Sequence, residues 1–166
     1  MIELYLAQAN RAVAHVREKL PRGSSNQAHS TKLAGTELNK ARGEAFELIG
    51  QGALHTGKMI ASTAFTAGAG NCGEQVYVAF EYLKKLGVSP LDIFAYGPHT
   101  GRDHAWLVIG RPAAAATRYI DDGWDDAVLC DPWYDFVGGA VANDDFYGNA
   151  RFILKERYTR RVTADF

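Results

Sequence analysis

Hydrophobic residues in the first 20 positions of the chain recur at spacings of three and four. This spacing places them on one face of an α-helix. The pattern predicts a helix that runs to Leu20 and ends at Pro21 and Gly23. The residues of this face are Ile2, Tyr5, Leu6, Ala9, Val13, Val16 and Leu20.

A polar loop is expected over residues 21–35, followed by a second helix from Thr36 to Gly50. The apolar face of this helix consists of Leu38, Ala41, Ala45, Leu48 and Ile49. Residues 53–70 are rich in Ala, Thr and Gly, and their hydrophobic positions follow only a weak period. The pattern therefore assigns no element to them.

The clearest predicted helix begins at Cys72. Asn71 is a good N-cap, and Glu74 stands three positions later, where it can complete a capping box. Gly87 is placed to end the helix. The apolar stripe consists of Val76, Ala79, Phe80, Leu83 and Leu86.

After Pro90 the pattern changes to short segments rich in aromatic and branched residues, which indicate strands. These segments are residues 91–96, 104–109, 127–131 and 151–158. Because helices come first and strands follow, the expected fold is α+β, with N-terminal helices packed on an antiparallel β-sheet. We expect one domain, residues 1–166, whose helical N-terminal part covers residues 1–65.

The composition and charge of the chain exclude several classes of protein but do not change the expected fold. With 166 residues, 47% of them hydrophobic, and a formal charge of −1, the chain fits one soluble domain with its own core. The balanced charge argues against nucleic acid or an anionic membrane as the main partner. No apolar run approaches the roughly 20 residues that span a bilayer, and the N-terminus lacks the apolar core of a cleavable secretory signal.

The numbers of cysteines and histidines limit the metal chemistry. Two cysteines, Cys72 and Cys130, are too few for a disulfide framework or a Cys-rich zinc site. The five histidines show no paired spacing. We therefore expect neither a metal site nor a cofactor.

Cys72 stands where a helix is expected to start, with Gly73 after it. The positive end of the helix dipole and the unpaired first-turn amides stabilise a thiolate there. The thiolate is the nucleophilic form of cysteine, so this placement suits covalent catalysis. The alternative is a buried cysteine that packs as a small hydrophobic residue.

A nucleophilic cysteine needs a base, and the base needs a residue that orients it. His104 opens one predicted strand and Asp131 closes the next. If the two strands are antiparallel neighbours, these ends lie side by side. Asp103 is the second candidate to orient His104, although alternation along a strand points it to the other face. The same alternation points Cys130 into the core, away from a disulfide with Cys72 that would block the nucleophile.

Three segments, read together, resemble the papain-like superfamily of Cys-His-Asp enzymes: AGNCGEQVYVAFEYLKKLGV, DHAWLVIG and DDAVLCDPW. The resemblance is greatest to the transglutaminase-like core, and it covers about residues 68–135. The variant with GNCGE and DHAW is similar to bacterial toxin and effector enzymes, which include cysteine proteases and protein-glutamine deamidases. The resemblance implies Cys72 as nucleophile, His104 as general base and acid, and Asp131 as the residue that orients His104.

The resemblance also implies an oxyanion site made by the Cys72 backbone N–H and a second donor. Papain-like proteases place a glutamine a few residues before the cysteine. Here Thr66 stands in that stretch, and no Gln or Asn lies between Gln51 and Asn71. Asn71 and Gln75 are the candidates for the second donor.

The chemistry implied by this resemblance is acyl transfer through a thioester. We expect a thiol amidohydrolase that acts on a protein substrate, with a host protein as one candidate. A protein-glutamine deamidase is favoured over a cysteine protease because the chain is small and lacks the upstream glutamine. A peptidoglycan amidase is a third option, and a catalytically idle protein-binding module is the non-enzymatic alternative.

Trp106, Trp124 and Trp133 are candidates to line a substrate slot, with a core role as the alternative for each. The segment 111–125 is either a substrate-facing loop or a solvated connection. The resemblance further suggests a protein of the bacterial cytoplasm that is exported, secreted or delivered into a target cell without a cleavable signal peptide.

Overall fold

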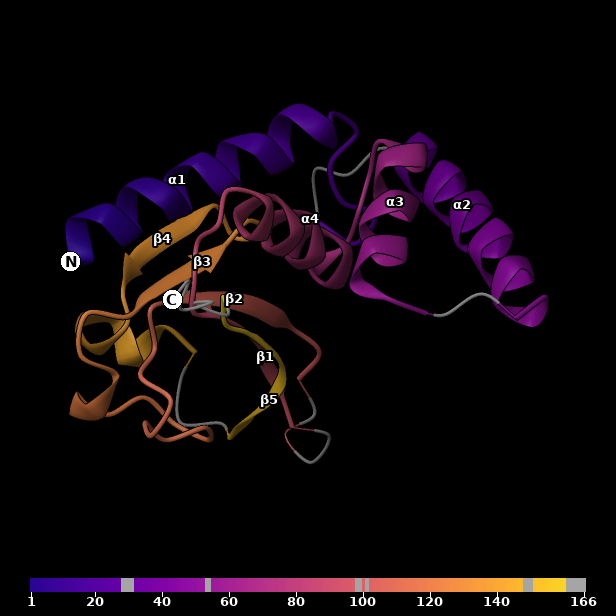
Figure 1. Ribbon diagram of the computed structural model, residues 1–166. Helices are drawn as coiled ribbons and strands as arrows, with labels where there is room; N and C mark the ends of the chain where they lie inside the picture. The colour runs from indigo at the N-terminus through magenta and orange to yellow at the C-terminus, as the bar shows by residue number, and fades with distance from the viewer. Residues whose placement is uncertain (28–31, 53–54, 98–99, 101, 148–150, 161–166) are drawn as a thin grey trace, which may run out of the picture.

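The computed structural model describes residues 1–27, 32–52, 55–97, 100, 102–147 and 151–160. Within these ranges the fold is α+β, with four α-helices followed by a five-stranded antiparallel sheet (Figure 1). The helices are α1 (Ile2–Lys19), α2 (Lys32–Gly50), α3 (Gly57–Ala67) and α4 (Cys72–Lys85). The strands are β1 (Leu91–Tyr96), β2 (Ala105–Ile109), β3 (Val128–Asp131), β4 (Phe136–Gly139) and β5 (Phe152–Tyr158). None of the described helices is long and apolar enough to cross a membrane.

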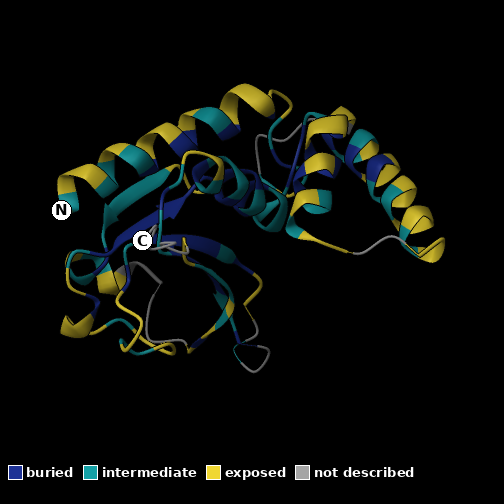
Figure 2. Cartoon of the chain, in the orientation of Figure 1, coloured by how far each residue is buried: buried dark blue, intermediate teal, exposed yellow. Residues whose placement is uncertain are grey.

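The strands lie in the order β4-β3-β2-β1-β5, and each neighbouring pair is antiparallel. Helices α1 and α4 pack on one face of this sheet, whereas α2 and α3 continue the helical layer beyond its edge (Figure 1). The buried residues follow the line where α1 and α4 meet the strands (Figure 2). The main core cluster includes Val13, Val16, Phe80, Leu83, Ile93, Leu107, Ile109 and Cys130.

A second, aromatic core covers the opposite face of the sheet. Trp106 and Trp124 are fully buried in it, and the Phe94 ring lies 5.3 Å from the Trp124 ring between centroids. Segment 111–125 contributes Trp124 to this core and contains the buried Arg111. It joins the Ile109 end of β2 to the start of β3, which is the end of these strands away from His104 and Asp131. Of the two alternatives for this segment, the substrate-facing loop is therefore wrong, and most of the segment is exposed as a solvated connection would be.

Helix α4 and the four predicted strands are confirmed within one residue at their ends. Helix α2 starts at Lys32, four positions before the predicted Thr36. Ala34 and Leu38 pack against Ala67 and Ala69, so tertiary contacts account for this earlier start. Residues 28–31 of the predicted loop lie outside the described residues.

Helix α3 was not assigned from the sequence because its buried face is made of small residues, including Ala61, Ala64 and Ala67. Alanine gives little hydrophobic contrast with Ser and Thr, so the period is weak. Local signals set its ends: the Thr56 hydroxyl accepts a hydrogen bond from the Met59 N–H at 3.3 Å, and Gly68 adopts a left-handed conformation with φ 63°.

Strand β4 was also missed. Half of its four residues are glycine, a residue depleted in strands. It forms an edge of the sheet by pairing with β3, with Asp131 opposite Phe136. A side chain at Gly138 would meet Asn143 at 2.8 Å, so close packing and not strand propensity explains the glycine.

One buried charged cluster lies at the start of β1. Asp92 is fully buried, and its Oδ2 accepts hydrogen bonds from Arg111 Nε at 3.0 Å and from Arg157 Nη1 at 2.8 Å. Arg111 is itself only 1% exposed and lies over the Phe94 and Trp124 rings. Removing one member of such a cluster leaves an uncompensated charge in the core.

We therefore expect Asp92→Ala to lower the free energy of unfolding by about 3–5 kcal/mol, measured by urea denaturation at pH 7. The matched control is Asp103→Ala, which removes an exposed carboxylate two residues before β2. That variant should stay within about 0.5 kcal/mol of the wild type. Equal losses in the two variants would show that the buried cluster adds nothing specific to stability.

Candidate active site

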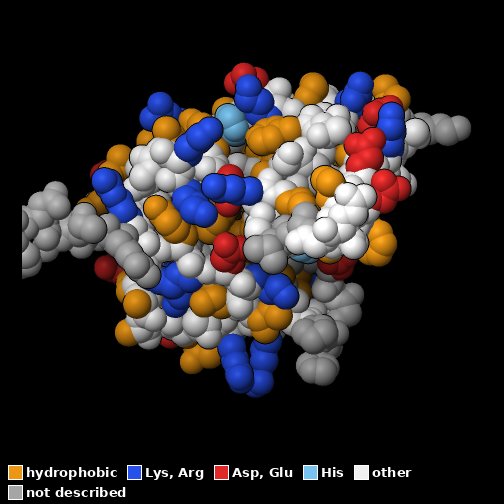
Figure 3. Space-filling view, turned by 45° about the vertical axis from the view of Figure 1, so that its right-hand side comes forward, with side chains coloured by type: hydrophobic (Ala, Val, Ile, Leu, Met, Phe, Trp, Pro, Cys, Tyr) orange, Lys and Arg blue, Asp and Glu red, His pale blue; other side chains and the backbone are white. Residues whose placement is uncertain are grey.

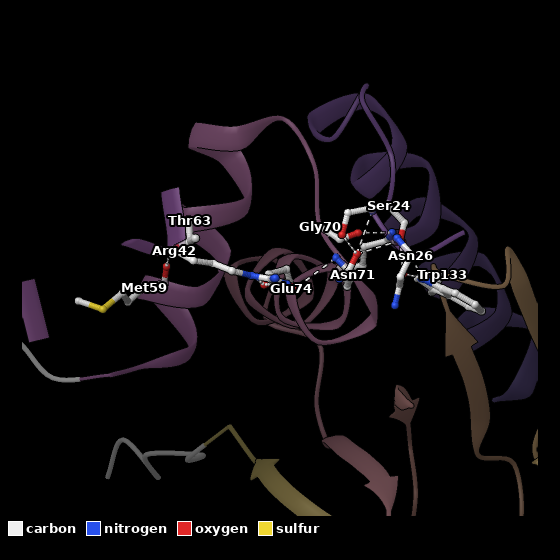
Figure 4. A network of polar contacts seen from close by, with 11 residues as sticks. Ser24, Asn26, Arg42, Met59, Thr63, Gly70, Asn71, Glu74 and Trp133 are labelled. Carbon is white, nitrogen blue, oxygen red and sulfur yellow. Dashed lines mark hydrogen bonds and ion pairs between the residues drawn. The ribbon is translucent and has the colours of Figure 1, made fainter. Parts of the chain in front are cut away.

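Cys72 is the first residue of α4, and polar contacts fix the backbone at this point. Asn71 is the N-cap, with extended backbone angles of φ −83° and ψ −173°. Its N–H donates to Glu74 Oε2 at 3.0 Å, which is the contact predicted for a capping box. Glu74 Oε1 accepts from Arg42 Nε at 2.7 Å, so α2 also holds the first turn of α4 (Figure 4).

The loop between α1 and α2 folds over the start of α4 and holds the Asn71 side chain. Asn71 Oδ1 accepts hydrogen bonds from the Ser25 N–H at 3.0 Å and the Ser25 hydroxyl at 2.9 Å. It also lies 3.0 Å from Ser24 Oγ (Figure 4). Because a backbone N–H can only donate, this contact identifies the oxygen of the amide group. The Asn71 nitrogen therefore points away from the two serines.

The same loop reaches Trp133, two residues after β3. Trp133 Nε1 donates to Asn26 Oδ1 at 3.0 Å and lies 3.1 Å from Ser24 Oγ (Figure 4). Gln27 Nε2 donates to the Trp133 carbonyl oxygen at 2.6 Å. Residues 24–27 thus connect the start of α4 to the segment that follows Asp131.

His104 and Asp131 come together as the antiparallel pairing of β2 with β3 requires. Cys130 lies opposite Leu107, so the residue before β2 and the last residue of β3 are close. His104 Nε2 lies 2.5 Å from Asp131 Oδ2, and Asp131 Oδ1 accepts from the Tyr134 N–H at 3.3 Å. The Asp131 side chain is fully buried and that of His104 is 8% exposed, so water competes little for this contact.

Cys72 completes the arrangement, because it lies close enough to His104 to interact with the imidazole. Nε2 of the imidazole is taken by Asp131, which leaves Nδ1 for the sulfur. Burial by itself lowers the pKa of His104, but its interactions with Asp131 and Cys72 outweigh burial and raise this pKa to about 9. This raised pKa favours the imidazolium form of the ring at neutral pH.

Aromatic rings surround the imidazole. The ring centroids of Trp133 and Tyr134 lie 5.5 Å and 4.9 Å from that of His104, both inclined to it. Trp106 stacks at 6.2 Å from the core side and has no exposed surface. Trp106 therefore supports the imidazole from behind, and the expectation that Trp106 lines a substrate slot is wrong.

The structure places the remaining candidate site residues differently from one another. Gln75 is 6% exposed and its Nε2 donates to the Gly70 carbonyl oxygen at 2.8 Å, so this amide is already used within the fold. Asp103 is exposed, and Asp131 takes the role of contacting His104. Sequence reasoning missed Tyr134, which is 55% exposed beside His104. Its position two residues after the Asp-Pro pair was the available signal.

Cys130 lies in the main core, as alternation along β3 predicts. Its side chain is fully buried, and its Sγ lies 3.7 Å from the Ala9 carbonyl oxygen. Burial, and after it the charge of Asp131, raises the pKa of the Cys130 thiol well above its ordinary value. Both cysteines are free thiols, and Cys72 is partly exposed.

A groove of about 780 Å³ begins beside Trp133 and Gln75 and runs between the end of α1 and the turn after β3. It is lined by amide side chains as well as apolar ones. They include Val16, Leu20, Asn26, Gln27, Pro132 and Tyr134. Arg17 and Asp135 form an ion pair of 2.8 Å at its border.

Among the described side chains, no group of three or more His, Cys, Asp or Glu is arranged to hold a metal ion. Comparisons with known proteins add no assignment. No protein-family model matches the chain, and no curated protein matches it significantly.

The difference between the two cysteines can be tested directly. In the native protein we expect iodoacetamide to modify Cys72 and leave Cys130 untouched, because only the Cys72 thiol is exposed. At pH 6 the rate at Cys72 should fall in His104→Ala, because the imidazole that can accept the thiol proton is lost. Peptide mass spectrometry locates the adducts, and unfolded protein is the control in which both thiols react. Comparable modification of Cys130 in the folded protein would contradict the structure.

The raised pKa of His104 also predicts a pH dependence of stability. A group whose pKa is higher in the folded state stabilises fully below its unfolded value, here 6.5, and the contribution is lost as pH rises through about 9. The free energy of unfolding of the wild type should therefore exceed that of His104→Gln most at pH 6. The difference should shrink by pH 10, as measured by urea denaturation at each pH. A difference that grows between these pH values would reverse the assigned charge.

Proposed function

We propose that this protein is a cysteine-dependent amide hydrolase with a papain-like, transglutaminase-like fold. The observation that carries the proposal is the placement of His104 between Asp131 and a partly exposed cysteine at a helix start. Each part has a defined chemical use: nucleophile, proton carrier and orienting carboxylate. A histidine or cysteine with a purely structural role would not require the other two residues of this arrangement beside it.

In the proposed reaction the Cys72 thiolate attacks an amide carbonyl carbon and forms a C–S bond. The developing oxyanion accepts hydrogen bonds from the Cys72 backbone N–H and from Asn71 Nδ2. His104 gives its Nδ1 proton to the leaving nitrogen as the C–N bond breaks, which leaves a thioester. His104 then takes a proton from water, and the water oxygen attacks the carbonyl carbon of the thioester. The C–S bond breaks, which releases the carboxylic acid and regenerates the thiolate–imidazolium pair.

Asn71 is favoured over Gln75 as the second oxyanion donor. The serines fix the Asn71 oxygen, and the bonds in the described part of the chain leave its nitrogen open. The Gln75 nitrogen is bonded to Gly70. Asn71 also precedes the nucleophile directly, so it compensates for the upstream glutamine that the sequence lacks.

The favoured reaction is deamidation of glutamine in a protein substrate, with ammonia as the leaving group. The site needs only to admit one side chain beside Trp133 and Tyr134, and both rings lie against His104. A protein of this kind would be a bacterial effector or toxin that acts on a host protein after delivery.

One observation favours proteolysis as the second candidate. The groove beside Trp133 has a volume of about 780 Å³ and carries the amide groups of Asn26 and Gln27 along its wall. Amide side chains can bond the backbone of an extended peptide, which a deamidase does not require. The products separate the two reactions: deamidation releases ammonia and leaves the substrate intact, whereas proteolysis releases fragments.

We expect Cys72→Ala to abolish turnover of dimethylated casein, assayed in parallel for ammonia and for fragments. His104→Ala should reduce the rate by about 10²–10⁴-fold because the proton carrier is lost. Asp131→Asn should reduce it less, since the imidazole remains near the thiol. Asp103→Ala is the matched control and should keep wild-type activity.

Circular dichroism must show the folded state for each variant in these assays. Equal activity in the wild type and in Cys72→Ala on a verified substrate would overturn the proposal. A wild type that is inert toward proteins and purified peptidoglycan, with an unreactive Cys72, would favour the binding-module alternative.

A further inference from the structure

A second concave surface lies away from Cys72, between α1, α3 and α4. It has a volume of about 720 Å³ and is bordered on one side by Tyr158 of β5. The proposed hydrolase chemistry makes no use of it. We refer to it as the lysine groove, after the four lysines that line it: Lys19, Lys58, Lys84 and Lys85.

The lysine groove has a net positive charge, whereas the chain as a whole has a formal charge of −1. Its four lysines come from three different helices, and Glu81 is the one carboxylate among the described residues that line it. Lys84 lies 3.6 Å from Glu81, and Lys19 lies 3.6 Å from Glu18. Lys58 and Lys85 are exposed at the rim. Figure 3 shows Lys and Arg side chains around a histidine and hydrophobic side chains in the upper part of the view.

The floor of the groove is aromatic and apolar. His15 stacks on Tyr82 with ring centroids 4.1 Å apart, and Phe65 is 45% exposed at the wall. The Lys84 ammonium lies 5.4 Å from the centre of the Tyr158 ring. Burial, together with the positive charge of Lys19, lowers the pKa of His15, so the imidazole is neutral at pH 7 and belongs to this floor.

The lysines at the rim and the apolar floor together indicate which kind of ligand the lysine groove can bind. A bare phosphate would use the lysines but would leave the apolar floor unfilled. A flat bilayer cannot enter a concave surface lined by three helices. A peptide that alternates carboxylates with apolar side chains matches both parts, because its carboxylates can pair with the rim and its apolar groups can cover Phe65 and Tyr82.

The distance between the lysine groove and the Cys72 thiol shows which role a bound peptide could have. Lys85 and Cys72 stand at opposite ends of α4, and 13 residues at 1.5 Å each separate them by about 20 Å. A segment bound in the lysine groove is therefore distinct from the amide that reacts at Cys72. It would hold the substrate protein without taking part in the chemistry.

We infer that the lysine groove is an exosite that binds an acidic segment with interspersed apolar side chains on the substrate protein. This inference rests on the proposed function for its role in selecting substrates. Its binding step can be measured without turnover, so the two proposals can fail separately.

The test uses the fluorescein-labelled peptide Glu-Leu-Glu-Glu-Phe-Glu-Leu-Glu and the Cys72→Ala protein, with binding followed by fluorescence anisotropy. We expect saturable binding that Lys58→Glu combined with Lys85→Glu weakens at least tenfold. The matched control combines Lys40→Glu with Lys155→Glu, which makes the same charge change at exposed lysines outside the groove. The control should bind within twofold of Cys72→Ala alone.

Three further probes discriminate between occupants. A peptide with Ser in place of Leu and Phe should bind at least fivefold more weakly, because the floor is left uncovered. Pyrophosphate should not displace the labelled peptide at equal concentration, and vesicles containing phosphatidylserine should not sediment the protein. Displacement by pyrophosphate, sedimentation with vesicles, or equal binding by the groove and control variants would each overturn the exosite.

His15 lines the lysine groove and can serve as an NMR probe of peptide binding. Its ring proton resonances should shift on peptide binding, and its titration midpoint should rise as carboxylates approach. If peptide binding persists while Cys72 proves inert toward substrates, the groove remains a binding site and the hydrolase proposal fails. If the groove variants bind like the control while Cys72 and His104 keep their reactivity, only the exosite fails.

Discussion

The antiparallel pairing of β2 with β3 is the constraint on which the candidate site depends. It brings the start of one strand to the end of the other, so His104 and Asp131 meet without any dedicated loop. The two core clusters hold this pairing from both faces of the sheet. The stability of the sheet and the geometry of the imidazole therefore have the same physical origin.

The helical layer supplies the third member of the site through a different set of contacts. Helix α4 packs on β1 and β2, and this packing directs its first turn toward His104. The residues that fix this turn are polar: Arg42 holds Glu74, and Ser25 holds Asn71. Hydrogen bonds depend on orientation more strongly than apolar contacts do. These hydrogen bonds therefore fix the position of the first turn of α4 more closely than the packing of α4 against the small alanine side chains of α3.

Local patterns in the sequence were sufficient to predict the elements that depend on hydrophobic periodicity and helix capping. The stripe from Val76 to Leu83 and the cap at Asn71 predicted α4, and strand order predicted the meeting of His104 and Asp131. The position of segment 111–125 could not be predicted in this way, because it depends on Trp124 entering an aromatic core formed by distant strands. Trp106 was misassigned for the same reason.

The contacts of the loop before α2 were also beyond sequence reasoning. Gln27 and Trp133 are 106 positions apart, and no periodicity relates them. Such contacts depend on where whole elements pack, and single Ser, Asn and Gln residues in a polar loop carry no signal of it. Asn71 illustrates the limit, since the sequence identified it as a cap but not which atom of its amide would remain available.

The burial of Cys130 has a consequence for the fate of Cys72 under oxidising conditions. A sulfenic acid on a reactive cysteine is usually rescued when a neighbouring thiol condenses with it to form a disulfide. The second thiol of this chain is sealed in the core beside Ala9 and cannot take that role in the folded protein. A sulfenic acid at Cys72 therefore depends on thiols from outside the molecule for its reduction, and without them further oxidant converts it to the sulfinic and then the irreversible sulfonic acid.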